Sequence, residues 1–159
     1  EKGKTAPAIP KAVKSFLSDT SSFSPEWSGS ILRMLPESVR GAYPLLREHL
    51  RILSAGICIG EAKGKDFIPA EELALSTALR PDAFPVADLD WDDAIRYLKK
   101  EALLLPAGTE KGYVLVRHKK FPLGFAKHLG NRANNLYPQE WRIRTGYVPE
   151  KVKTFEMKV

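Results

Sequence analysis

Two stretches of alternating side chains in the last third of the chain most constrain how it can fold. Residues 113–118 and 123–129 both alternate in the two-residue period of a β-strand. Residues 119–122, Lys-Lys-Phe-Pro, separate them as a turn, and residues 130–135 follow as a polar loop. Residues 141–144 fit a third short strand. These patterns predict a small curled sheet or barrel at this end of the chain.

The preceding part mixes helical and strand patterns. Two runs are typical of strands, at residues 31–35, which Pro36 ends, and at residues 51–59. Three segments favour helices: an amphipathic one capped by Ser38, one over residues 71–79 behind Pro69, and one capped by Asp90 with Trp91, Ile95 and Leu98 on one face. No βαβ repeat is present, so we expect an α+β fold in which a small mixed helix/strand domain precedes the curled sheet or pseudo-barrel.

Composition divides the chain into three parts. Residues 1–25 are rich in Lys, Pro, Ser and Thr and are expected to be a linker. We expect a small α+β domain at 26–106 and a second module at 107–159. No run of 18 apolar residues predicts a membrane span, and no apolar signal segment stands at the start. Because the chain begins with Glu1 instead of Met, we expect it to be part of a longer protein.

The net charge of +6 is concentrated in one segment. Residues 111–144 hold eight Lys or Arg and one acid, Glu140, which gives +7 over 34 residues, whereas the tail from Thr145 carries +1. The first 110 residues therefore carry a net −2. A local excess of this kind favours a polyanionic partner.

Few residues are candidates for catalysis or metal binding. The single cysteine, Cys58, has apolar neighbours and fits a small buried side chain better than a nucleophile. It also indicates a reducing compartment. The three histidines are not at ligand spacing, and the acidic pairs at helix starts favour the helix dipole. We therefore predict no catalytic residue and no metal site in this chain.

The basic segment interleaves cations with aromatic and amide side chains, which suits RNA or DNA. The candidate phosphate ligands are Lys119, Lys120, Lys127, Arg132, Arg142 and Arg144. The candidates for contacts with sugars and bases are Asn131, Asn134 and Asn135, and His128 completes the set. The alternative is a barrel whose aromatics form the core and whose Lys and Arg are solvated. Asn residues in such a loop can equally serve the turn itself.

Residues 112–142 resemble the C-terminal PUA-like module of bacterial Nol–Nop–Sun family RNA cytosine-5 methyltransferases. The shared motifs are Pro122-Leu123-Gly124, Phe125, Lys127, Gly130, Arg132, Asn135 and Tyr137-Pro138. Residues 32–37, 52–61, 67–76 and 92–101 resemble the small domain that precedes this module, so the likeness covers about residues 31–144. One departure is Ala70-Glu71, where the family often has Ser-His, and no role of that His is carried over.

The resemblance implies an RNA-binding part of an S-adenosylmethionine-dependent enzyme, acting on ribosomal RNA in the cytoplasm. The family's two catalytic cysteines stand in Pro-Cys and Thr-Cys motifs, whereas Cys58 follows Ile57. The catalytic domain and its cofactor are therefore expected before Glu1, with that domain as a partner besides RNA, or else to be absent from the parent protein. Two alternatives stay open: a module that docks on the catalytic domain or a ribosomal protein, and an independent enzyme.

Overall fold

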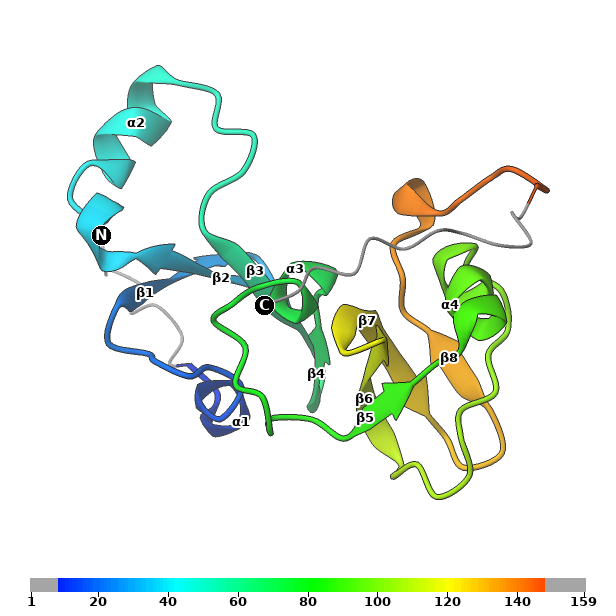
Figure 1. The fold of residues 1–159 in the computed structure, drawn as a ribbon. Helices are drawn as coiled ribbons and strands as arrows, with labels where there is room; N and C mark the ends of the chain where they lie inside the picture. Colours follow the sequence, from blue (N-terminus) through cyan, green and yellow to red (C-terminus); the bar gives the residue numbers. More distant parts are fainter. Residues whose placement is uncertain (1–8, 148–159) are drawn as a thin grey trace, which may run out of the picture.

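The computed structural model describes residues 9–147, which form two four-stranded sheets with few and short helices (Figure 1). The first sheet has the strand order β1-β2-β3-β4, and the second has the order β5-β6-β7-β8. This mixture confirms the predicted α+β class with a curled-sheet module.

The first sheet is an antiparallel meander in which each strand pairs with the next along the chain. Its strands are β1 (Phe23–Ser28), β2 (Ile31–Pro36), β3 (Ile57–Lys63) and β4 (Asp66–Pro69). The predicted strand at 31–35 is confirmed as β2, while the one predicted from residue 51 begins only at Ile57. Strand β1 was not predicted; it holds Pro25 at the edge of the sheet, where a missing N–H is tolerated.

Between β2 and β3 the chain leaves the sheet as η1 (Glu37–Val39) and α2 (Tyr43–His49). The helix predicted from Ser38 is therefore divided, and Pro44 lies in the first turn of α2, where its missing N–H is harmless. No residue of α2 is buried, and Figure 1 shows this helix standing away from both sheets. Its apolar side chains therefore do not contribute to the core.

The second sheet combines one parallel and two antiparallel pairings. Its strands are β5 (Val86–Asp88), β6 (Gly112–His118), β7 (Phe121–His128) and β8 (Ala133–Asn135). The period-2 pattern thus located β6 and β7 correctly. It missed β8 within the expected polar loop, and residues 141–144 are not a strand, because η2 (Gln139–Trp141) occupies the start of that segment.

Helix α4 (Trp91–Leu98) connects β5 to the rest of the second sheet. Asp90 caps it as predicted, since its side chain accepts the backbone N–H of Asp93 at 2.9 Å. The buried residues of α4 are Ala94 and Tyr97, and not the predicted face of Trp91, Ile95 and Leu98, which are only half-buried. The helix ends in a Schellman motif, in which Lys100 and Glu101 donate to carbonyl oxygens of the last turn.

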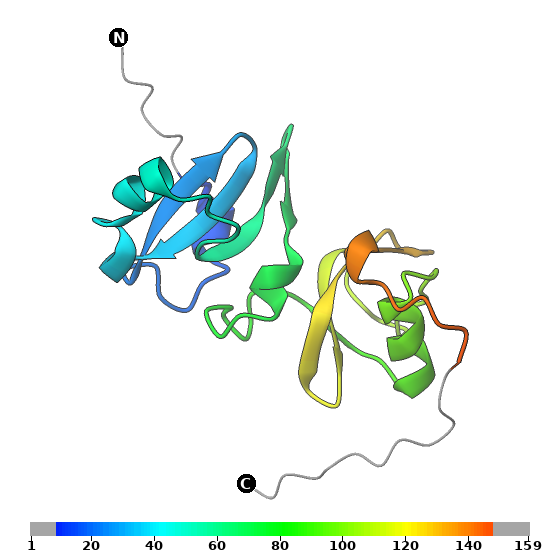
Figure 2. The ribbon, with the colours of Figure 1, turned by 90° about the horizontal axis from the view of Figure 1, so that it is seen from above.

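One hydrophobic core joins the two sheets. Leu32 and Ile59 of the first sheet belong to the same buried cluster as Leu115 and Phe125 of the second. Figure 2 shows the two sheets with the short green helix at residues 71–74 between them. Leu73 of α3 (Glu71–Ala74) completes the contact. Both sheets therefore bury apolar side chains against a shared centre.

The opposite face of the second sheet is covered by α4. Val116 and Ala126 pack in a second cluster with Tyr97 of that helix. Because neighbouring strand residues point to opposite faces, Val116 and Ala126 lie behind the adjacent core residues Leu115 and Phe125. The second sheet is consequently buried on both of its faces.

These packing relations bear on the expected domain boundaries. The expected linker, residues 1–25, contains α1 (Lys11–Lys14) and the start of β1, and Val13 is fully buried in the shared core. The expected boundary between residues 106 and 107 falls within the unit formed by β5, α4 and β6. Over residues 9–147, no helix is long and apolar enough to cross a membrane.

A buried carboxyl group lies at the junction of the two sheets. Glu71 of α3 is only 8% exposed, and burial raises its pKa to about 8. Its neighbours are the Tyr97 hydroxyl and the backbone of β7 at Gly124 and Phe125. The Tyr97 hydroxyl donates to the Phe125 carbonyl at 3.0 Å, and burial raises the pKa of Tyr97 as well. Three elements thus meet around one buried carboxyl group.

Candidate nucleic-acid interface

The C-terminal end of α4 is the place where basic side chains from separate segments meet. One groove is lined by Arg132, just before β8, and by Asn134 within that strand. Arg96 of α4 and the exposed Leu104 line the same groove. Glu101 also lies in this groove. Arg96 keeps a long contact of 3.6 Å with Asp93 of its own helix, and its side chain remains 61% exposed.

A second groove adjoins the first through Glu101. Arg142 and Arg144 line it with Lys99, the last residue of the α4 turn. The segment is fixed to the helix, because the backbone N–H of Ile143 donates to the Leu98 carbonyl at 2.9 Å. We call Arg96, Lys99, Arg132, Arg142 and Arg144 the α4 basic cluster. The five cations outnumber the carboxylates beside them, which are Glu101 and, near Arg96, Asp92 and Asp93. The surface is therefore net positive and suited to phosphates.

Lys100 lies between these residues but serves the fold. Its φ of 63° places it in the left-handed position that ends the Schellman motif. Its Nζ donates to the Tyr137 carbonyl, and burial lowers the pKa of its ammonium group. The side chain therefore ties the end of α4 to the segment after β8.

Lys127, a predicted phosphate ligand, is engaged with the first sheet instead. Its Nζ lies 2.5 Å from Oδ2 of Asp66 in β4, and 4.8 Å from the ring centre of Tyr113. The Tyr113 hydroxyl donates to the same carboxylate at 2.8 Å. These hydrogen bonds lower the pKa of Asp66 and raise the pKa of Lys127. The group bridges β4 to β6 and β7.

Two further predicted residues have intramolecular partners. The Asn135 amide donates to the Tyr97 and Glu101 carbonyls at 2.8 and 3.2 Å, and its oxygen accepts the Tyr137 N–H at 2.9 Å. A ring nitrogen of His128 lies 3.1 Å from the Glu110 carbonyl. Both side chains therefore contact the backbone around the second sheet.

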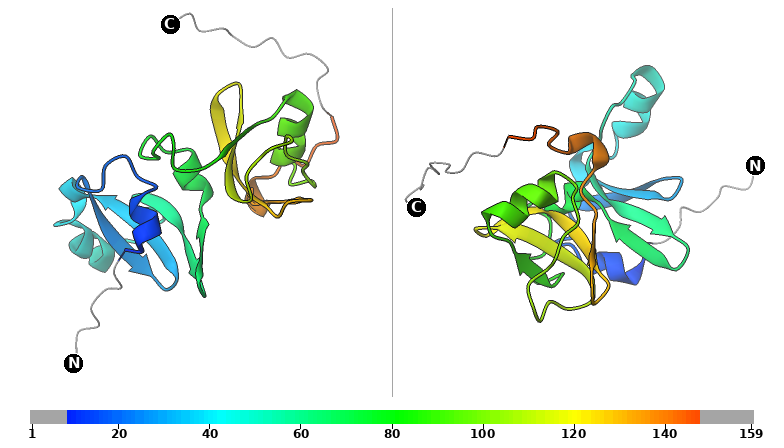
Figure 3. Two further views of the ribbon diagram at one scale, coloured as in Figure 1. Left: turned by 90° about the horizontal axis from the view of Figure 1, so that it is seen from below. Right: turned by 90° about the vertical axis from the view of Figure 1, so that its right-hand side faces the viewer.

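Lys119 and Lys120 lie elsewhere, at the tip of the β6–β7 hairpin, which projects from the second sheet (Figure 3). Asn131 is exposed in the loop between β7 and β8. The predicted residues therefore divide between the α4 end, the hairpin tip, the β7–β8 loop and half-buried positions with partners in the fold. Arg96 and Lys99 were not among them. Their signal was the Arg-x-x-Lys-Lys run at the end of the predicted helix.

The aromatic side chains of the basic segment fall into two groups, packed and exposed. Phe125 is fully buried, and Tyr137 packs edge-on against Tyr97 with ring centres 5.4 Å apart. Phe121 and Trp141 are 69% and 50% exposed. Only the last two present ring faces that a base could reach.

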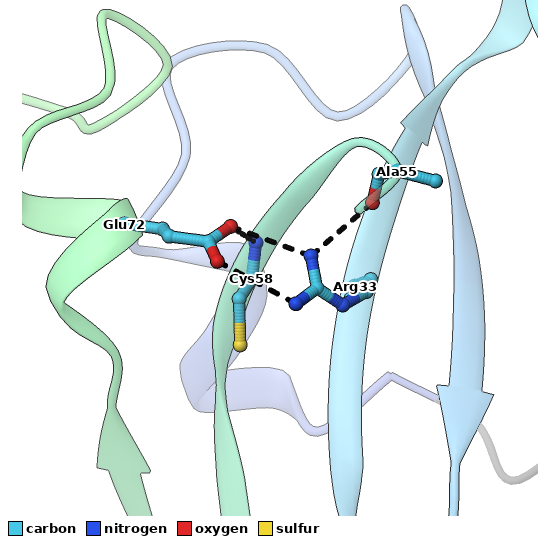
Figure 4. Close-up of polar contacts among 4 residues, drawn as sticks. All are labelled: Arg33, Ala55, Cys58 and Glu72. Atoms are coloured by element: carbon cyan, nitrogen blue, oxygen red, sulfur yellow. Dashed lines mark hydrogen bonds and ion pairs between the residues drawn. The ribbon is translucent and has the colours of Figure 1, made fainter. Parts of the chain in front are cut away.

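Cys58 belongs to a polar contact between the first sheet and α3 (Figure 4). Its backbone N–H donates to the Glu72 carboxylate at 2.8 Å, and Arg33 reaches the same carboxylate at 3.4 Å and the Ala55 carbonyl at 3.3 Å. Burial raises the pKa of the Cys58 thiol, which is the opposite of what nucleophilic activation requires. Over the described part of the chain, no three His, Cys, Asp or Glu residues gather as metal ligands.

Comparison with known proteins identifies the second sheet. Residues 84–143 match the family model of the methyltransferase RsmF PUA domain, a stretch that contains β5 to β8, α4 and η2. The ribosomal RNA small subunit methyltransferase F of Shewanella pealeana is 32% identical over 92 residues. That match covers 57% of this chain and 18% of the relative, so the chain corresponds to less than a fifth of that protein. Residues 84–143 are therefore similar to the PUA domain of the methyltransferase RsmF, which agrees with the resemblance to the Nol–Nop–Sun methyltransferases.

Proposed function

We propose that this chain binds RNA for an S-adenosylmethionine-dependent RNA (cytosine-5) methyltransferase that acts on ribosomal RNA. The observation that carries this proposal is the α4 basic cluster, in which side chains from α4, the β7–β8 connection and the segment after η2 meet around Glu101. Residues so far apart in sequence form one cationic surface, and exposed arginines suit the geometry of phosphate groups.

Such a surface has a physical task in RNA methylation. An enzyme that modifies a base must extract it from a stacked helix, which costs a few kcal/mol. Phosphate contacts made by an appended domain offset that cost and orient the RNA. Folded RNA is recognised mainly through its shape, phosphates and 2′-hydroxyls. Arg132 and Asn134 side by side provide a phosphate ligand and a hydrogen-bonding amide for this purpose.

The chemistry itself belongs to another part of the parent protein. The sequence contains neither a Pro-Cys nor a Thr-Cys pair, and its single thiol has a raised pKa. We therefore assign the nucleophile and S-adenosylmethionine to a catalytic domain outside this chain, and assign no residue here to the cofactor. A ribosomal RNA substrate would place the protein in the cytoplasm.

Salt-dependent binding of a stem-loop RNA by the 159-residue chain tests the proposal. Affinity should fall steeply as salt rises, because bound phosphates release counterions. Replacing Arg132 and Arg142 by Ala should weaken binding about tenfold or more at low salt. The slope of log K against log salt should become shallower by about 1 to 2, since each phosphate contact contributes somewhat less than one unit.

The matched control removes two exposed lysines, Lys63 and Lys65, from the β3–β4 turn of the first sheet. This variant has the same net charge as the double arginine variant, so a difference between them reports position instead of total charge. Equal affinity of wild type and both variants would refute the assignment of the α4 basic cluster. A wild-type chain without measurable affinity for RNA would refute RNA binding altogether.

A second surface favours a protein partner. Leu45, Leu50 and Leu53 are 59%, 61% and 86% exposed on and after α2, which contributes nothing to the core. Clustered apolar residues of this kind are typical of contact surfaces. We propose the catalytic domain of the parent protein as the partner of α2. Hydrogen exchange should be slower in α2 of the parent protein than in this chain, and equal exchange would contradict the contact.

A further inference from the structure

The turn between β6 and β7 has a backbone that its residues do not favour. His118 pairs with Phe121 in the register, so Lys119 and Lys120 alone form the loop. Their φ angles are 48° and 72°. A two-residue hairpin loop with positive φ at both positions is the type I′ turn, for which Asn-Gly is the preferred pair. Two lysines occupy these positions although side chains with a Cβ are sterically disfavoured there.

The same tip exposes an aromatic ring. Phe121 directly follows the two lysines and is 69% exposed, more than the other aromatic residues of the second sheet. On the neighbouring strand, His118 is fixed by a 2.8 Å contact between its Nδ1 and the Leu89 carbonyl. Trp91 lies edge-on to the His118 ring at 6.0 Å. The strand next to the loop is thus held by side-chain contacts, while the loop itself and Phe121 are open to solvent.

The charge of the tip is not cancelled by the nearest acid of β5. Asp88 is held by Arg117 through two hydrogen bonds of 2.6 Å, from Nε and Nη2. Lys119 and Lys120 are both exposed. Two exposed lysines therefore directly precede an exposed aromatic residue, in a turn whose backbone conformation is disfavoured for them. Such strain occurs where a function maintains it.

We propose that Lys119, Lys120 and Phe121 form a second RNA contact that holds an unpaired nucleotide, with its base stacked on Phe121 and its phosphates at the two lysines. This inference rests on the proposed RNA-binding function and adds the class of RNA. A base buried in a duplex cannot present its face to a ring, whereas a base in a loop or bulge can. The tip therefore recognises single-stranded segments, and the α4 basic cluster binds phosphates of any structure.

Two RNAs of equal length separate the two contacts: a stem-loop with six unpaired nucleotides and a blunt duplex. In the 159-residue chain, Phe121→Ala should weaken binding of the stem-loop about 5- to 150-fold, the range expected for loss of one stacked base. Its affinity for the duplex should stay within about twofold. Phe121→Tyr keeps an aromatic face and should bind both RNAs as wild type does. Lys119→Asn with Lys120→Gly keeps the turn type, and should weaken the stem-loop more than the duplex.

A fluorescent base analogue, 2-aminopurine, placed in the RNA loop gives a direct readout of stacking. Its fluorescence should be quenched by wild type and by Phe121→Tyr, but not by Phe121→Ala. If Phe121→Ala binds both RNAs as wild type does, or weakens both equally, the tip contact is refuted. In that case Arg132→Ala with Arg142→Ala still tests the proposed function by itself. If the wild-type chain binds neither RNA, the proposed function fails and the tip contact fails with it.

Discussion

The carboxyl group of Glu71 is buried, with only 8% of the residue exposed. It lies at the junction of the two sheets, and its Oε1 has no hydrogen-bond partner among the described residues. Burial raises its pKa from 4.5 to about 8, so the folded protein favours the neutral acid. The unfolded chain ionises this group near its ordinary pKa. The contribution of Glu71 to stability is therefore complete below about pH 4.5 and is lost as the pH rises to about 8.

Glu71→Gln should remove this part of the pH dependence, because an amide has a similar shape and carries no proton to lose. We expect the variant to match wild type at pH 5 and to exceed its free energy of unfolding by about 2 kcal/mol or more at pH 8. Urea denaturation at the two pH values measures the difference. A wild-type stability that stays constant from pH 5 to pH 8 would show that Glu71 is not held neutral.

Gly124 explains how the carboxyl group fits at this junction. A Cβ at this position would overlap both the Glu71 carboxylate and the Tyr97 hydroxyl, and the φ of 148° is itself disfavoured for other residues. Gly124→Ala should therefore lower the free energy of unfolding by about 2 kcal/mol. Gly41→Ala is the matched control, since nothing lies within 4 Å of its Cβ. Equal melting temperatures of the two variants would contradict the close packing of the junction.

At the scale of elements, we expect one change in the β6–β7 turn to raise the stability of the fold and to lower its affinity for RNA. Lys119→Asn with Lys120→Gly introduces the pair that type I′ turns prefer, so we expect the free energy of unfolding to rise by about 1 kcal/mol. Thermal denaturation of the variant and wild type measures this change. A variant that gains stability and loses affinity for loop RNA would link the disfavoured backbone to binding. A loss of stability would instead contradict the positive φ angles.

Elements with strong local signals could be predicted from the sequence. The alternation around Lys119 and Lys120 located β6 and β7, and the Asp90 cap located the start of α4. Strand β5 has only three residues, and its partner β6 lies more than 20 residues further along the chain. A pairing between such distant segments cannot be predicted from local periodicity. Residues 141–144 were predicted as a strand, but the segment begins within η2, and the backbone N–H of Ile143 donates to the Leu98 carbonyl after α4 instead of to a strand.

The candidate site was predictable only in part, for the same physical reason. Composition identified the cations, but a charge in the sequence does not reveal its partner in the fold. Lys127 and Arg132 both looked like phosphate ligands, yet Lys127 meets Asp66 across the sheets while Arg132 lines a groove. The role of α4 was missed because Arg96 and Lys99 become part of a surface only when β8 and residues 142–144 pack beside them.

At the scale of the whole molecule, the shared core predicts that the two sheets unfold together. The match to the RsmF PUA domain begins at residue 84, but Phe84, Leu115 and Phe125 are buried against residues of the first sheet and α3. A boundary defined by sequence similarity therefore cuts through one hydrophobic cluster. The full chain should show one cooperative transition, with Trp fluorescence and far-UV circular dichroism changing at the same temperature.

A fragment of residues 84–147 should be much less stable than the chain. Removing the first sheet and α3 exposes apolar side chains that each contribute about 1.5–3 kcal/mol when buried, and three of them approach the whole stability of a small domain. We expect the fragment to melt at a clearly lower temperature and to bind an apolar dye that the chain does not bind. A fragment as stable as the chain would contradict the shared core. The first sheet would then be an independent domain, and the RNA contacts of the second sheet would not depend on it.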